Sequence, residues 1–149
     1  MKHPKTLFIC QGNVYRSRLA EAYLSSLRKD TREVKSAGIF PRRDVNGPIA
    51  WSALRLIKIH KLIPYMSRDW RPFNKEITEW AELIVFFEKE NRVRGEELIH
   101  KKLNCLVWEV PDVPSSELLP GGEAQHIQET ELGFQKIKML VDDLFEKEK

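Results

Sequence analysis

The chain has 149 residues, of which 42% are hydrophobic and 32% are charged. This balance is typical of a globular protein, and the length predicts one domain over residues 1–149. The longest apolar stretches, such as residues 83–87, are far shorter than the roughly 20 residues of a membrane-spanning helix. The basic N-terminus also lacks the long apolar run of a signal peptide. We therefore expect a cytoplasmic protein.

The formal net charge is +3, and the two cysteines are Cys10 and Cys105. This small charge suits an anionic substrate but does not indicate nucleic-acid binding, and no aromatic-basic recognition motif is present. Two cysteines cannot build a disulfide framework, and the cysteines and histidines lack the spacing of zinc ligands. We therefore expect no metal, no nucleic acid and no membrane among the partners.

The hydrophobic pattern predicts strands alternating with helices along the chain. The predicted strands cover residues 5–10, 33–36, 84–87 and 104–109. The predicted helices cover residues 17–29, 48–60, 77–83, 91–99 and 123–146. In the second helix Pro48 suits the first turn, and in the last helix Gly133 is expected to interrupt the apolar stripe.

This alternation indicates an α/β fold with three layers, in which a four-stranded parallel sheet carries helices on both faces. In such sheets the ligand crevice lies beyond the carboxyl ends of the strands. Cys10 ends the first predicted strand and Asp112 follows the fourth. We therefore expect both residues at the functional edge of the sheet.

The seven residues after Cys10 can form a phosphate-binding loop between the first strand and the first helix. Their backbone N–H groups can converge on one oxyanion, supported by the positive end of the helix. Gly12 and Asn13 tolerate the left-handed conformations that such a loop requires. The predicted phosphate-binding residues are Gln11, Gly12, Asn13, Val14, Tyr15, Arg16 and Ser17.

Cys10 is the candidate nucleophile of this loop. Loop amides, the helix terminus and Arg16 surround its expected position, and surroundings of this kind stabilise a thiolate. The planar fork of Arg16 can hold two phosphate oxygens, and Ser17 can donate a hydrogen bond to the sulfur. A buried cysteine followed by an ordinary turn would explain Cys10, but it would not explain the four residue types that follow it, namely Gly12, Asn13, Arg16 and Ser17. Cys105 lies inside a predicted strand, and we interpret it as a core residue.

The stretch LFICQGNVYRS followed by LAEAYL closely resembles the phosphate loop and first helix of the low-molecular-weight protein tyrosine phosphatase family. Residues 36–38, Ser-Ala-Gly, are similar to the turn after that family's second strand, and residues 110–112, Val-Pro-Asp, resemble its general-acid loop. The resemblance covers nearly the whole chain. It implies a four-stranded parallel sheet and a metal-independent, cofactor-independent phosphatase with a cysteine nucleophile.

The resemblance and the residue chemistry predict the same catalytic roles. Cys10 attacks phosphorus and forms a phosphocysteine, while Arg16 and the loop amides hold the phosphate oxygens. Asp112 protonates the leaving oxygen and then activates water, with Asp44 and Asp69 as alternative acids. The expected activity is hydrolysis of aryl phosphate monoesters such as phosphotyrosine, on a protein or a small molecule. Phosphate and vanadate are the expected site ligands.

Several positions depart from the family pattern. Val113 and Pro114 follow Asp112, so the aromatic residue that would stand against a phosphotyrosine ring is missing. Tyr15 replaces the loop's frequent second cysteine, and Arg18 replaces a common proline, where we expect it to place a positive charge at the rim. Glu88 stands where the family often has aspartate.

Other residues are expected to support the loop and to line the cleft. No counterpart of the family's network histidine occurs near residues 67–71, and we expect three residues to support one another instead, namely Asn13, Ser17 and Ser36. The candidate cleft residues are Tyr15, Phe40 and Trp51. Phe40 stands where the family often carries its specificity aromatic, whereas Trp51 can equally be a core residue.

Two other functions are compatible with this fold. One is a non-catalytic oxyanion-binding or interaction module that keeps the loop without efficient acid catalysis. The other is arsenate reduction, in which a thiolate attacks arsenate and further cysteines resolve the adduct. That relay needs two resolving thiols, and the sequence offers only Cys105.

Overall fold

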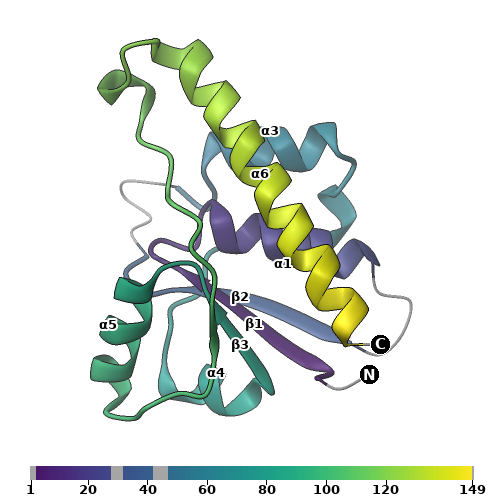
Figure 1. The fold of residues 1–149 in the computed structure, drawn as a ribbon, viewed down its shortest axis with the longest axis vertical. Helices are drawn as coiled ribbons and strands as arrows, with labels where there is room; N and C mark the ends of the chain where they lie inside the picture. The colour runs from purple at the N-terminus through teal and green to yellow at the C-terminus, as the bar shows by residue number, and fades with distance from the viewer. Residues whose placement is uncertain (1–2, 28–31, 42–46, 149) are drawn as a thin grey trace.

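The computed structural model describes residues 3–27, 32–41 and 47–148, which form a four-stranded parallel sheet with helices on both faces (Figure 1). The strands are β1 (Lys5–Cys10), β2 (Glu33–Gly38), β3 (Leu83–Phe86) and β4 (Leu106–Val107), in the order β2-β1-β3-β4. The helices are α1 (Arg16–Leu27), α3 (Trp51–Ile59), α4 (Lys75–Trp80), α5 (Lys89–Ile99) and α6 (Gly122–Lys147). Short 3-10 turns are η1 (Ile63–Tyr65) and η2 (Ser116–Leu118). The predicted fold class is confirmed.

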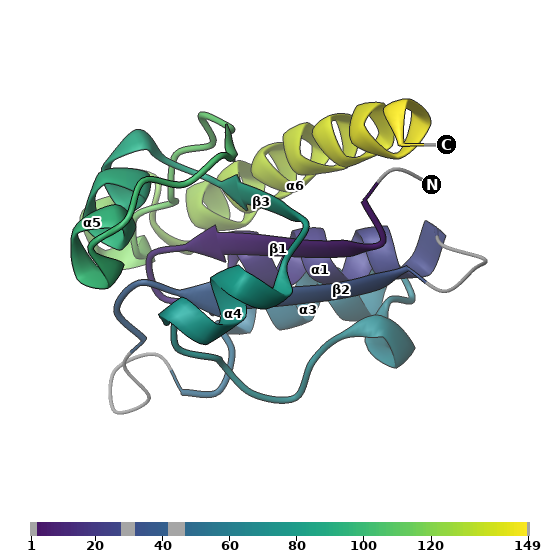
Figure 2. The same cartoon turned by 90° about the horizontal axis from the view of Figure 1, so that it is seen from below.

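The central strand β1 separates two hydrophobic cores. Because successive side chains of a strand point to opposite faces, Phe8 and Cys10 join the core under α1, α3 and α6, whereas Leu7 and Ile9 join the core under α4 and α5. Figure 2 shows α4 in front of the strands, with α1 and α3 behind them. Cys10 pairs in register with Gly38 of β2, so both residues stand at the same edge of the sheet.

Several elements differ from the sequence prediction in their bounds or continuity. Helix α3 begins at Trp51 and not at Pro48, because Ala50 has an extended backbone and donates its N–H to Val14 O at 2.9 Å. Strand β4 has only two residues, after which Trp108 packs against the rings of Phe8 and Phe87. Helix α6 continues through Gly133, so the expected interruption is wrong.

Within the described ranges, no helix combines the length and the apolar character needed to cross a membrane.

Candidate active site

The phosphate loop is the turn between the end of β1 at Cys10 and the start of α1 at Arg16. Asn13 has a positive φ of 55°, as a loop that curls its amides inward requires. The loop lies directly on β2, since a Cβ atom built on Gly38 would come within 2.8 Å of the Asn13 nitrogen. Only glycine fits at position 38, which gives a steric reason for the glycine of the Ser-Ala-Gly motif, and this motif ends β2 instead of forming a turn after it.

The Cys10 sulfur is buried beneath this loop, with the residue only 2% exposed. Its Sγ lies 2.9 Å from Ser17 Oγ, and Asn13 Nδ2 donates to the same Ser17 Oγ at 2.8 Å. Since Ser17 already accepts from Asn13, its own hydroxyl proton is available for the sulfur. The backbone N–H of Arg71 donates to Asn13 Oδ1 at 2.6 Å and fixes the amide orientation. A thiolate at Cys10 would therefore meet a ready donor.

Arg16 is the buried cation of the site. Its Nη1 donates to Val110 O at 2.8 Å and lies 2.5 Å from Glu88 Oε1, while Nη2 lies 3.9 Å from Asp112 Oδ2. Burial acts to lower the pKa of the Arg16 guanidinium, but the negative groups of Cys10, Asp112 and Glu88 outweigh it and raise that pKa. Arg16 therefore stays charged, which an anion-binding group must be.

Asp112 reaches the site from the segment after β4. Its side chain is 61% exposed, and its Oδ1 accepts a hydrogen bond from the Val113 N–H at 3.0 Å. Of the alternative acids, Asp69 is half-buried and accepts from the Trp70 N–H at 2.8 Å, and Asp44 lies outside the described residues. Asp112 thus pairs with Arg16.

Two adjoining hollows open over the loop and share Gln11, Phe40 and Asp112 in their walls. One has a volume of about 680 Å³ and includes Arg16 and Glu88. The other has a volume of about 550 Å³ and is lined by Gln11, Gly12, Val14, Tyr15, Phe40, Ala50, Trp51, Ser52, Asp112, Val113, Ser115 and His126. Trp51 is 58% exposed and is therefore not a core residue.

Tyr15 contributes to this wall in a different way from the two exposed aromatics. It is only 6% exposed, and its hydroxyl donates to Thr130 O of α6 at 3.1 Å. Burial is the main cause that raises the pKa of the Tyr15 phenol, and Asp112 raises it further. Tyr15 therefore ties the loop to α6 and presents little surface to the hollow.

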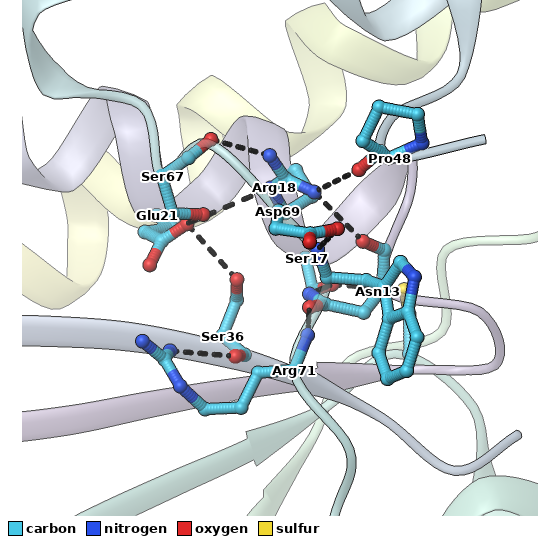
Figure 3. A network of polar contacts seen from close by, with 11 residues as sticks. Asn13, Ser17, Arg18, Glu21, Ser36, Pro48, Ser67, Asp69 and Arg71 are labelled. Atoms are coloured by element: carbon cyan, nitrogen blue, oxygen red, sulfur yellow. Dashed lines mark hydrogen bonds and ion pairs between the residues drawn. The ribbon is translucent and has the colours of Figure 1, made fainter. Parts of the chain in front are cut away.

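Two expectations about residues around the loop are wrong, one for Arg18 and one for Ser36. Arg18 is fully buried, so it adds no charge at the rim. Ser36 donates its hydroxyl proton to Glu21 Oε1 at 2.9 Å, so it supports Glu21, whereas Asn13 and Ser17 do contact each other (Figure 3). The sequence does not indicate that Arg18 and Glu21 are buried, because an Arg and a Glu three residues apart on a helix are usually an exposed pair.

The second cysteine, Cys105, lies away from the phosphate loop. Cys105 lies just before β4, half-buried against the core under α4 and α5, and burial raises the pKa of its thiol. In the part of the chain that the structure describes, no group of three His, Cys, Asp or Glu side chains is arranged to hold a metal ion.

Comparison with known proteins adds a family match and several similar folds. The family model described as "Low molecular weight phosphotyrosine protein phosphatase" matches residues 5–109. The tyrosine phosphatase Wzb from Escherichia coli K30, in complex with phosphate, has a TM-score of 0.74 at 17% identity, with 97% of this chain and 98% of that chain covered. Wzb from Vibrio vulnificus, in complex with benzylphosphonate, has a TM-score of 0.69 at 16% identity, with 93% and 97% covered.

A third similar structure is the thioredoxin-dependent arsenate reductase from Corynebacterium glutamicum. Its TM-score is 0.66 at 18% identity, and the match covers 97% of this chain and 61% of that chain. At such identities the structures show a shared fold. A search of curated protein sequences gave no match.

Proposed function

The chain belongs to the low molecular weight phosphotyrosine protein phosphatase family, and on that premise we propose that it hydrolyses aryl phosphate monoesters such as phosphotyrosine through a phosphocysteine at Cys10. One arrangement carries the proposal. At the carboxyl end of β1, Cys10 Sγ lies 2.9 Å from a hydroxyl donor, Ser17, and the buried Arg16 beside it pairs with the exposed carboxylate of Asp112. Arg16 and Asp112 line one hollow, and this arrangement supports the roles of Cys10 as nucleophile, Arg16 as anion-binding cation and Asp112 as acid.

In the first step the Cys10 thiolate attacks phosphorus in line with the ester oxygen. The S–P bond forms as the P–O bond breaks, and Asp112 transfers its proton to the departing phenolic oxygen. The Arg16 fork and the loop N–H groups hold the three other phosphate oxygens, whose charge they stabilise through the transition state. Glu88 already holds Arg16 at 2.5 Å and keeps its fork in place.

In the second step a water molecule hydrolyses the phosphocysteine. Asp112, now a carboxylate, takes a proton from the water as the new P–O bond forms and the P–S bond breaks. The departing sulfur recovers its negative charge, and the Ser17 hydroxyl at 2.9 Å stabilises it. Inorganic phosphate leaves, and Asp112 is again protonated for the next cycle.

The depth of the site favours an aryl ester over an alkyl ester. Cys10 is only 2% exposed beneath the loop, and exposed aromatic side chains stand at the cleft, namely Phe40 and Trp51. A phosphorylated phenol is long enough to reach the sulfur while its ring stays among these side chains, whereas phosphoserine is shorter. The benzylphosphonate bound to the Vibrio vulnificus protein is a ligand of this aromatic class.

Hydrolysis of p-nitrophenyl phosphate between pH 5 and 8, without added metal, tests this function. We expect Cys10→Ser to abolish turnover, because its hydroxyl is a poor nucleophile at these pH values. We expect Asp112→Asn to lower kcat by about a hundredfold or more, the usual contribution of a general acid. Cys105→Ser is the matched control, and we expect it to keep wild-type turnover.

This assay, together with vanadate binding and arsenate reduction, separates the alternatives. If Asp112→Asn keeps wild-type turnover, Cys10 remains the nucleophile and the general acid is another residue. Wild-type protein that binds vanadate but releases no product would contradict the enzyme and favour a non-catalytic oxyanion-binding module. Thiol-dependent reduction of arsenate, with loss of activity in Cys105→Ser, would instead indicate an arsenate reductase.

A further inference from the structure

Arg18 places a buried positive charge directly behind the phosphate loop. The residue is fully buried on α1, and its guanidinium is surrounded by backbone carbonyls from three separate segments (Figure 3). Nη1 donates to Asn13 O at 3.2 Å and to Pro48 O at 2.7 Å, and Nη2 donates to Ser67 O. Arg18 therefore joins the phosphate loop to two segments that are distant in sequence.

The contact with Asn13 O sets the orientation of one loop peptide. A trans peptide holds its C=O and the following N–H on opposite sides, so the carbonyl held by Arg18 leaves the Val14 N–H pointing away from Arg18. Asn13 also has a φ of 55°, a conformation that costs energy outside glycine and needs support from its surroundings. Arg18 supplies such support at the carbonyl.

The other groups around this peptide hold it from further sides. The side chain of Asn13 is fixed between Ser17 Oγ and the Arg71 N–H, and Val14 O accepts the Ala50 N–H at 2.9 Å. Arg18 binds Pro48 O in the same segment as Ala50. The loop and the start of α3, which carries Trp51, are thus connected through Arg18.

Glu21 is the counter-charge, and it is also buried. Its Oε1 lies 3.9 Å from Arg18 Nε and accepts the hydroxyl protons of Ser36 at 2.9 Å and Ser67 at 2.7 Å. Burial raises the pKa of the Glu21 carboxyl and lowers the pKa of Arg18, while the two opposite charges act against both shifts. Burying such a pair gains little stability over apolar side chains of similar volume, so stability alone is a weak reason for its presence.

We propose that Arg18 is a positioning residue of the phosphate loop, which holds the Asn13–Val14 peptide so that the Val14 N–H faces a phosphate group bound above Cys10. This inference rests on the proposed function, because it assigns the loop amides to a bound phosphate. Arg18 itself touches neither the substrate nor the sulfur in this arrangement. It acts through the peptide that it orients.

Three variants test the inference: Arg18→Met, which removes the charge and the donors; Arg18→Lys, which keeps the charge but loses the planar fork; and Arg55→Met. Arg55 pairs with Glu131 at 3.0 Å on the partly exposed side of α3 and serves as the matched loss of a positive charge. For each variant, kcat and KM for p-nitrophenyl phosphate, the dissociation constant of inorganic phosphate and the melting temperature are measured.

We expect Arg18→Met to raise the dissociation constant of inorganic phosphate about tenfold or more and to lower kcat by a similar factor. The reason is that a misdirected loop amide no longer donates to a phosphate oxygen. Arg18→Lys is expected to show most of this loss, because an ammonium group cannot reproduce the fork that spans three carbonyls. Arg55→Met is expected to keep wild-type kcat and phosphate affinity.

A folded Arg18→Met protein with wild-type phosphate affinity and kcat would overturn the inference. Full recovery of both constants in Arg18→Lys would overturn it as well, since charge alone would then account for the effect. If Arg18→Met does not fold, Arg18→Lys decides. If the wild-type protein shows neither turnover nor phosphate binding, the proposed function and this inference are overturned together. If the wild-type protein is active and both Arg18 variants match it, the inference alone is overturned.

Discussion

Phe40 and Trp51 keep large aromatic surfaces in contact with solvent at the rim of the cleft. They are 60% and 58% exposed, although burial of either ring would be favourable. Aromatic side chains left exposed around a hollow typically mark a binding surface. Because Val113 and Pro114 follow Asp112, this segment offers no aromatic residue against a phosphotyrosine ring, and Trp51 can offer an aromatic face from α3 instead.

We predict that Trp51→Ala raises KM for p-nitrophenyl phosphate about two- to tenfold and leaves kcat nearly unchanged. An aromatic contact contributes about 0.5–1.5 kcal/mol, and this contact exists both before and during the reaction. The inhibition constant of inorganic phosphate should stay the same, because phosphate has no ring. Leu54→Ala, on the same helix and also exposed, is the control. A fall in kcat at constant KM would contradict this role.

At the level of elements, Gly133 is where α6 meets the phosphate loop. A Cβ atom at this position would lie 2.9 Å from the Tyr15 hydroxyl, which donates to Thr130 O one turn earlier on the helix. The glycine therefore makes room for a loop residue and does not end the helix. The contact connects the last helix of the chain to the first loop.

This contact makes Gly133→Ala destabilising, although alanine is the better helix former by about 1 kcal/mol. We expect a loss of about 1–3 kcal/mol in the free energy of unfolding, the usual cost of overpacking. Tyr15→Phe removes the hydroxyl, and in that background Gly133→Ala should be neutral or stabilising. Urea denaturation of the four proteins measures the coupling, and additive effects would contradict the contact.

The elements differ in how far the sequence could predict them. The phosphate loop could be predicted because Cys10, Gly12, Asn13 and Arg16 are close in sequence and their residue types suit a loop of this kind. The role of Gly133 could not, because helix propensity contains no information about Tyr15. The burial of Arg18 was equally hidden, since its carbonyl partners come from residues 48 and 67 as well as from the adjacent loop.

For the molecule as a whole, one buried carboxylate binds the connection between α5 and β4. Glu96 is 8% exposed, and its Oε2 accepts the Leu103 N–H at 2.7 Å. Lys102 and Arg92 lie 3.7 and 3.6 Å from its oxygens. The backbone hydrogen bond from Leu103, followed by these cations, outweighs burial and lowers the pKa of Glu96 below its ordinary value of 4.5. The ionised form is therefore favoured in the folded chain.

This shift sets the sign of a pH effect on global stability. Below about pH 4.5 the unfolded chain binds a proton at Glu96 more readily than the folded chain, so the stabilisation present above that pH is lost as the solution is acidified. Glu96→Gln, which keeps an acceptor for Leu103 but carries no charge, should lower the free energy of unfolding by about 1 kcal/mol at pH 7. The difference from wild type should shrink toward pH 3.

Urea denaturation at pH 7, 5 and 3 measures this difference. Glu97→Gln is the matched control, because the Glu97 side chain is 64% exposed and its nearest described cation, Arg94, lies 3.9 Å away. A single exposed pair of this kind contributes little to stability, so the control should follow wild type at every pH. A Glu96→Gln deficit that stays constant from pH 7 to pH 3 would contradict a charged Glu96, since the wild-type carboxyl is neutralised over that range.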